Sequence, residues 1–486
     1  MLFHSFAYLL LFLPVVIVVH GVLRKHTAWP WPQVWLLVAS VFFYTRAPSA
    51  NLPLLAGSIL FNWAVARIMM AQHDLRKRKW VLLVGLTSNI IVLFLFKYVQ
   101  LFVETIAALH GPRLAFPDWG FPLGVSFFTL TQIMYLVDAY PRAPASPAAR
   151  KIFRGLLAPI SLFDHATFVM AFPYVVSGPL TRVRRVVPQL RTYAMTEQRD
   201  VMLCRGLFLF SMGLAKKVML GDSFGVIADA GFAAVSDYSL LEAWTFCAAS
   251  LFHLYFDFSG YSDMALGSAW MLGIDIPQNF NAPLRATSIA DFWQRWHISL
   301  SSFITEYLYS PLLRAMGTPS LASSATATIV AMSIAALWHG PAWTFVAWGM
   351  SHGLALAGQQ VWRRKSHELP NWIGWLSTFT FLTVTFVFLR ATSLAQAFHM
   401  ISRLLPHRQN LIGFTALHGL LPASPTAFFR STGIGLVVAF FFKTAMQYAS
   451  DYPLSRRTSL ATAILLVMSL IFMNSAPARQ FAYFAF

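Results

Sequence analysis

The sequence is dominated by apolar stretches long enough to cross a lipid bilayer. A transmembrane helix needs about 20 consecutive, mostly apolar residues. Only 11% of the residues are charged and 57% are hydrophobic, whereas soluble domains are about 25% charged. We therefore predict an all-α integral membrane protein with one continuous membrane domain over 1–486. The candidate spans are residues 5–22, 31–47, 53–72, 80–103, 121–139, 203–220, 241–256, 325–345, 346–362, 373–390, 431–448 and 459–475.

Three further apolar segments are shorter or interrupted by Pro, Gly and polar residues, namely 156–178, 262–274 and 296–315. Irregular backbone at membrane depth is tolerated only where it is buried in protein or lines a cavity. These segments are therefore expected to be re-entrant segments or half-helices.

The chain is basic, with 36 Lys+Arg against 18 Asp+Glu and a net charge of +18. Basic residues of membrane proteins collect in cytoplasmic loops, and no basic helix face indicates nucleic-acid binding. The predicted spans place the basic clusters on one side and both termini on the extracytoplasmic side. The apolar N-terminus lacks the basic start and cleavage site of a signal peptide, so we expect a retained first span. The clusters are residues 24–25, 74–79, 142–154, 182–205, 363–365 and 456–457.

The two cysteines, Cys204 and Cys247, offer neither a disulfide framework nor a zinc set. Both are expected to be packing residues. No pair of histidines has the spacing of a metal motif, so we predict no metal site.

Two polar islands interrupt the apolar body, at residues 255–312 and 336–353. Ionisable groups at membrane depth are functional candidates. His339 lies in Leu-Trp-His-Gly-Pro within an apolar run, where Gly340 and Pro341 are expected to break the helix. Apolar surroundings favour a neutral imidazole, which can act as a general base towards a hydroxyl. A buried histidine that only bonds a carbonyl is the structural alternative.

His297, in Gln-Arg-Trp-His-Ile-Ser, lies beside charged residues, and from spacing alone an interfacial structural histidine is favoured. His352 follows His339 closely enough to line the same cavity. For the carboxylates and amides of the first island, structural hydrogen-bonded pairing is favoured, with Arg285 and Arg295 as the nearest partners in sequence. These groups are Asp257, Asp263, Asn279 and Asn281.

At these residues the chain resembles the membrane-bound O-acyltransferase family, specifically its bacterial alginate O-acetylation branch. The resemblance covers nearly the whole chain. The matching segments, in the family's order, are MLFHSFAYLLLFLPVV at the start, FPLGVSFFTLTQIMYLVDAY, FPYVVSGPLTR, YFDFSGYSDMALG, NFNAP, RWHISLSSF, LWHGPAWTFVAWG and the closing FAYFAF.

The resemblance implies a helical ring around a central tunnel, in a multi-pass protein of the bacterial inner membrane. It implies a catalytic core at about 121–353, with His339 as the catalytic histidine and His297 as its companion. The implied reaction moves an acyl group, usually acetyl, from a cytoplasmic thioester to an extracytoplasmic hydroxyl. The residues expected to line the tunnel or support the site are Asp257, Asn279, Asn281, Trp296, Trp338, Ser299 and His352.

The implied donor is acetyl-CoA or an acyl carrier protein thioester, with no bound cofactor. The implied partners are the lipid bilayer and an extracytoplasmic SGNH-type, esterase-like protein. The chain departs from the family pattern at Gln294 and over Phe303–Tyr309, where basic residues are common, and this leaves the donor open. The acceptor is expected to be an exopolysaccharide or a residue on a secreted relay partner. A D-alanylation-like transferase, a transporter and a non-catalytic scaffold are the alternatives.

Overall fold

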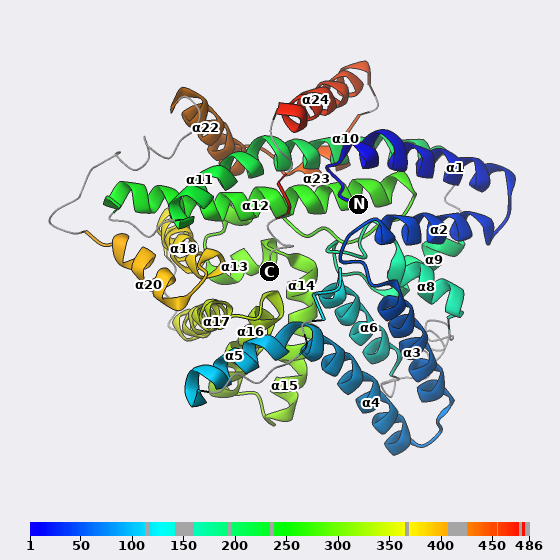
Figure 1. The fold of residues 1–486 in the computed structure, drawn as a ribbon, viewed down its shortest axis with the longest axis horizontal. Coiled ribbons are helices and arrows are strands. Elements are labelled where there is room, and N and C mark those ends of the chain that lie inside the picture. Colours follow the sequence, from blue (N-terminus) through cyan, green and yellow to red (C-terminus); the bar gives the residue numbers. More distant parts are fainter. Residues whose placement is uncertain are drawn as a thin grey trace. The chain divides into compact units, whose positions relative to one another are not determined.

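The computed structural model describes residues 1–111, 117, 119–140, 160–192, 196–233, 238–364, 369–406, 425–453, 455–475 and 479–481. Within these ranges every regular element is a helix and no strand occurs (Figure 1). The basic cluster at 142–154 and the closing motif after Phe481 lie outside the described residues.

The chain forms two compact units. The first comprises Met1–Leu207 and Ala265–Pro277, and the second Phe208–Met264 and Gln278–Phe486. The predicted single domain over 1–486 stays a prediction. The first unit contains η1 (Tyr8–Phe12), α1 (Leu13–His26), α2 (Trp31–Thr45), α3 (Leu52–Ala71), α4 (Leu75–Leu93), η2 (Phe94–Tyr98), α5 (Val99–His110), α6 (Val125–Ala139), α8 (Leu162–Met170) and α9 (Val183–Arg191).

Helices α10 (Thr196–Ala215) and α12 (Leu240–Met271) have residues in both units. The remaining elements belong to the second unit: η3 (Lys216–Gly221), α11 (Asp222–Ala233), η4 (Pro283–Arg285), α13 (Ile289–Arg295), α14 (Ile298–Phe303), η5 (Ile304–Tyr309), α15 (Ser310–Ala315), α16 (Leu321–His339), α17 (Trp343–Arg363), α18 (Asn371–Thr385), α19 (Val387–Arg390), α20 (Leu394–Arg403), α22 (Pro425–Phe441), α23 (Ala445–Ser450) and α24 (Arg456–Ser475).

Six helical segments within the described ranges are long and apolar enough to cross a membrane. Each coincides with a predicted span, which confirms an all-α, multi-pass membrane protein. Other predicted spans form shorter helices, such as α2 with 15 residues. The six segments are Tyr8–His26, Leu52–Ala71, Leu75–Leu109, Leu321–His339, Asn371–Arg390 and Arg456–Ser475.

Helix α12 corrects one expectation. The apolar segment 262–274 was expected to be a separate half-helix, because Gly260 and several polar residues precede it. Instead its first ten residues continue α12, which runs unbroken for 32 residues from Leu240 to Met271. A Cβ at Gly260 would lie 2.7 Å from the Gly213 carbonyl oxygen. This glycine therefore allows close helix packing rather than a break.

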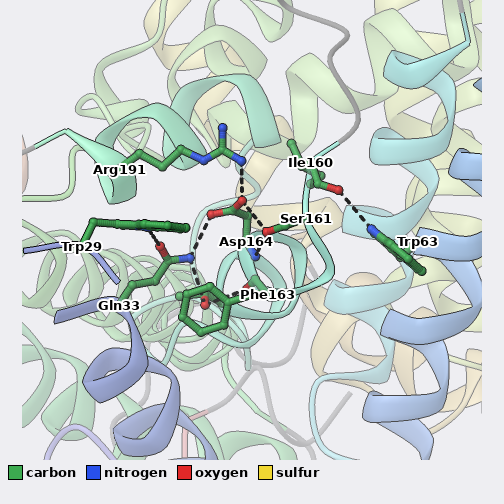
Figure 2. Close-up of polar contacts among 9 residues, drawn as sticks. Trp29, Gln33, Trp63, Ile160, Ser161, Phe163, Asp164 and Arg191 are labelled. Atoms are coloured by element: carbon green, nitrogen blue, oxygen red, sulfur yellow. Dashed lines mark hydrogen bonds and ion pairs between the residues drawn. The ribbon is translucent and has the colours of Figure 1, made fainter. Parts of the chain in front are cut away.

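The expected half-helix at 156–178 is α8, which has nine residues. Figure 2 shows how its first turn is fixed within the first unit. The carboxylate of Asp164 accepts hydrogen bonds from Gln33 of α2, from Ser161 and from Arg191 of α9. The Asp164 side chain is fully buried, so these three donors supply the partners that a buried carboxylate needs. One acidic residue thereby joins α2, α8 and α9.

In the second unit, α16 and α17 pack closely because α17 carries glycines where it faces α16. A Cβ at Gly349 would lie 2.7 Å from the Met332 carbonyl oxygen, and one at Gly353 would lie 2.8 Å from Cα of Ile329. Small residues that let two backbones approach are typical of helix packing in membranes. This close approach brings the start of α17 against the end of α16, where His339 lies.

We expect Gly349→Ala to lower the free energy of unfolding by about 1–3 kcal/mol, because the added methyl group meets backbone atoms that cannot move independently. Gly358→Ala on the same helix is the control, since a Cβ there meets nothing within 4 Å. Unfolding is followed in detergent by the reactivity of buried Cys247 in a Cys204→Ser background, because Cys204 is exposed. Equal thermal midpoints for the two glycine variants would contradict this packing.

Candidate functional site

His297 is held in an unusual backbone conformation at the start of α14. It precedes the helix with φ 43° and ψ 53°, a left-handed conformation that is rare for residues other than glycine. Such conformations cost about 1–3 kcal/mol and cluster at functional sites. The residue is fully buried within the protein, which its charged neighbours in sequence did not indicate. Its ring packs edge-on against Phe258 of α12, with centroids 4.8 Å apart.

His339 is the last residue of α16, and the predicted helix break at Gly340 and Pro341 is present. Gly340 is extended and α17 begins at Trp343. The imidazole is 7% exposed, and its centroid lies 6.3 Å from that of His297. Because a hydrogen bond spans about 3 Å, one small polar group between the two rings can contact both. The structure thus brings together the two histidines that the sequence singled out.

The indole ring of Trp348 of α17 packs against His339. The two rings are perpendicular, with centroids 5.3 Å apart. The indole also contacts Trp293 of α13 and His352, at 5.8 and 5.1 Å. These rings form a continuous aromatic wall behind His339. Trp348 lies within the motif LWHGPAWTFVAWG, but the sequence analysis singled out only Trp338 of its tryptophans.

His352 is part of this wall and both of its nitrogens are engaged. The Trp293 indole N–H donates to His352 Nδ1 at 3.2 Å. The Thr385 hydroxyl donates to the Phe381 carbonyl at 2.8 Å, so His352 Nε2–H donates to the Thr385 oxygen at 3.1 Å. This network assigns a neutral imidazole protonated on Nε2. His352 is thereby fixed in one orientation.

Asn279 fixes the turn that carries His297. Its side-chain oxygen accepts hydrogen bonds from the Ser299 N–H and hydroxyl, at 3.1 and 2.7 Å. Its backbone carbonyl accepts from the Ile298 N–H at 3.0 Å. These bonds satisfy donors at the start of α14, as a capping residue does. Asn281 is joined to the same turn through its backbone, since its N–H donates to the Arg295 carbonyl at 2.9 Å.

The two tryptophans that directly precede the histidines in sequence are both buried. Trp338 contacts the ring of His339, with centroids 5.1 Å apart. Trp296 instead packs among Phe280, Phe292 and Phe386, at 5.0–5.5 Å. Trp296 is therefore part of the aromatic core beneath the turn that carries His297.

The carboxylates of the first island have partners that sequence proximity did not indicate. Asp257 pairs with Lys217, and Asp263 with Lys216, each at 2.6 Å. Arg295 pairs with Asp291, and Arg285 donates to the carbonyls of Ala439 and Phe442. The two carboxylates are thus paired, as expected, but with lysines of η3 rather than with the arginines nearest in sequence, because α12 packs against η3. Across the described ranges, no group of three or more His, Cys, Asp or Glu side chains has the geometry to hold a metal ion.

Comparison with known proteins identifies the class. A sequence model of the membrane-bound O-acyltransferase family matches residues 72–397. The chain is 33% identical to a peptidoglycan O-acetyltransferase of Helicobacter pylori over 525 residues, covering 100% of this chain and 98% of that protein. It is 34% identical to a probable alginate O-acetylase of Azotobacter vinelandii, covering 82% and 77% of the two chains. A teichoic acid D-alanyltransferase of Bacillus subtilis is more distant, at 26% over 51% of this chain.

The fold and these relatives define a multi-pass membrane acyltransferase. The chain belongs to the membrane-bound O-acyltransferase family and is similar to the alginate O-acetylases within it.

Proposed function

We propose that this enzyme moves an acetyl group from a cytoplasmic thioester to a hydroxyl of an extracytoplasmic polysaccharide, with His339 as the general base and His297 as its companion. The observation that carries the proposal is the pair of buried imidazoles whose centroids lie 6.3 Å apart. The relatives that cover most of the chain carry the names of polysaccharide O-acetyltransferases, which supports acetyl as the group and a sugar hydroxyl as the acceptor.

In the proposed mechanism, His339 removes the proton of the acceptor hydroxyl as its oxygen attacks the thioester carbonyl carbon. Collapse of the tetrahedral intermediate breaks the C–S bond, and the protonated His339 returns the proton to the departing thiolate. Protons balance within the site, so no further acid or base is required. His297 contacts the same reacting group from the opposite side and orients it.

We further propose that the protein lies in the bacterial inner membrane with both termini outside. The basic cluster at 74–79, which forms the start of α4, then faces the cytoplasm, as the asymmetry of charged loops requires. The donor is acetyl-CoA or an acetylated carrier protein, and the acceptor sugar is reached directly or through an SGNH-type partner outside the membrane. Exposed arginines beside the cytoplasmic leaflet would attract either acidic donor.

Inside-out vesicles loaded with soluble peptidoglycan fragments or with alginate oligomers test this function. Labelled acetyl-CoA is added outside, which is the cytoplasmic face. We expect base-labile acetyl esters to form inside, with an equal amount of free coenzyme A outside. Entry of the label without ester formation would indicate a transporter and overturn the proposal. Transfer from a D-alanyl carrier protein but not from acetyl-CoA would instead favour D-alanylation.

A further inference from the structure

Two buried N–H donors adjoin the histidine pair and have no hydrogen-bond partner among the described residues. They are the indole Nε1 of Trp348 and the amide Nδ2 of Asn279. Trp348 is 2% exposed and Asn279 is 1% exposed. Leaving a buried donor unpaired is energetically unfavourable, and such groups in native proteins often have a catalytic role or another specific explanation.

The Trp348 N–H is unpaired beside an indole that is paired. Trp293, whose ring lies 5.8 Å from that of Trp348, donates its N–H to His352. An indole nitrogen can only donate a hydrogen bond. The Trp348 N–H is therefore satisfied only when an acceptor binds beside it. Its ring stands perpendicular to that of His339, with centroids 5.3 Å apart, so this indole adjoins the proposed base.

The Asn279 amide has a fixed orientation. The Ser299 backbone N–H donates to one side-chain atom of Asn279, and because an N–H requires an acceptor, that atom is the oxygen. The NH2 group is thereby directed away from Ser299. Asn279 binds both residues that follow His297 in the chain, so this second donor lies at the His297 side of the site.

We propose that Trp348 Nε1–H and Asn279 Nδ2–H form the oxyanion hole of this enzyme, binding the carbonyl oxygen of the acyl donor. The inference rests on the proposed acyl-transfer function. When the acceptor oxygen bonds to the carbonyl carbon, the C=O π electrons move to the carbonyl oxygen and create a negative charge. Preorganised N–H donors in a site that excludes water stabilise that charge.

Trp348→Phe removes the N–H and keeps an aromatic ring. Asn279→Asp removes the NH2 group and keeps the oxygen that Ser299 requires. Each variant is expected to lower kcat for acetyl transfer roughly 100-fold, the loss typical of removing one oxyanion donor, with little change in KM for acetyl-CoA. Trp375→Phe is the matched control, because it removes an indole N–H outside the site that already has a protein partner, the Leu284 carbonyl. Its activity per folded molecule is expected to match that of the wild type.

A second readout separates catalysis from folding. Dithioacetyl-CoA carries sulfur in place of the carbonyl oxygen and is a poorer hydrogen-bond acceptor. The ratio of rates with acetyl-CoA and dithioacetyl-CoA is measured within one preparation, so it does not depend on the amount of folded enzyme. We expect the ratio to fall roughly tenfold in Trp348→Phe and in Asn279→Asp, and to stay unchanged in Trp375→Phe.

Wild-type rates and ratios in both donor variants would overturn the oxyanion assignment while leaving the acyltransferase function intact. A wild-type protein that transfers no acetyl from either thioester would instead overturn the proposed function itself. A reduced ratio in the Trp375→Phe control would show that the ratio reports general distortion of the protein, and would also contradict the assignment.

Discussion

His339→Gln is expected to lower the rate of acyl transfer by at least about 1,000-fold while the protein remains folded in the membrane. Glutamine fills a similar volume and keeps a polar end, but it cannot accept the proton of the acceptor hydroxyl. The residue closes α16 just before an extended Gly340, so the substitution disturbs no helix interior. The rate is measured in vesicles with labelled acetyl-CoA, and the thermal midpoint with the Cys247 probe. Full activity of a folded His339→Gln protein would favour a scaffold role.

His297→Gln and the double variant then define how the two histidines act. Residues that serve one catalytic step as a unit show strongly non-additive losses. If both rings contact the same reacting group, as their 6.3 Å separation suggests, the double variant should be no slower than the slower single variant. Losses that multiply would show that the two histidines act in separate steps. In His297→Gln, the glutamine must adopt the same strained left-handed backbone without the packing of the imidazole ring. The thermal midpoint of this variant is therefore expected to fall as well.

The sequence predicted the helix break beside His339 correctly because the relevant signals are local. An ionisable residue in an apolar run is visible without a structure, and Gly340 and Pro341 end the helix through their own backbone properties. The same local logic failed for 262–274. There Gly260 looked like an interruption, but it packs against Gly213, and only the tertiary neighbour distinguishes a packing glycine from a helix break.

Contacts between residues that lie far apart in the sequence could not be predicted from local sequence signals. Lys217 lies far from Asp257 in sequence, yet both side chains are fully buried and in contact. The burial of His297 likewise follows from the packing of Phe258 and α12 around it. Whether an indole N–H is satisfied depends on its neighbours in space, so Trp293 and Trp348 cannot be told apart from sequence. In a chain this apolar, hydrophobic periodicity also carries little information about which face of a helix is buried.

Lys217→Met is expected to destabilise the second unit strongly, because it breaks a buried ion pair. The lysine Nζ lies 2.6 Å from a carboxylate oxygen of Asp257 and 2.6 Å from one of Asp222. The Lys217 and Asp257 side chains are 0% exposed. Removing one member of a buried ion pair leaves the other charge uncompensated and costs about 3–5 kcal/mol. A loss of that size lowers the thermal midpoint by about 10 °C.

Two further variants test whether burial of the ion pair causes the expected loss of stability. Lys443→Met breaks the pair between Lys443 and Asp451, whose side chains are 60% and 67% exposed, and is expected to cost less than about 1 kcal/mol. Lys217→Met combined with Asp257→Leu should recover most of the lost stability, because apolar side chains can replace a buried ion pair. A Lys217→Met protein that unfolds at the wild-type temperature would contradict the buried pair.

The same substitution should also reduce catalysis in molecules that remain folded. Phe258 follows Asp257 on α12, and its ring packs against His297 with centroids 4.8 Å apart. An uncompensated carboxylate at Asp257 is drawn towards water, and any rotation of α12 that exposes it moves Phe258 away from the histidine. The double variant should therefore recover activity together with stability. Recovery of stability alone would mean that Lys217 and Asp257 influence the site by a route other than the orientation of α12.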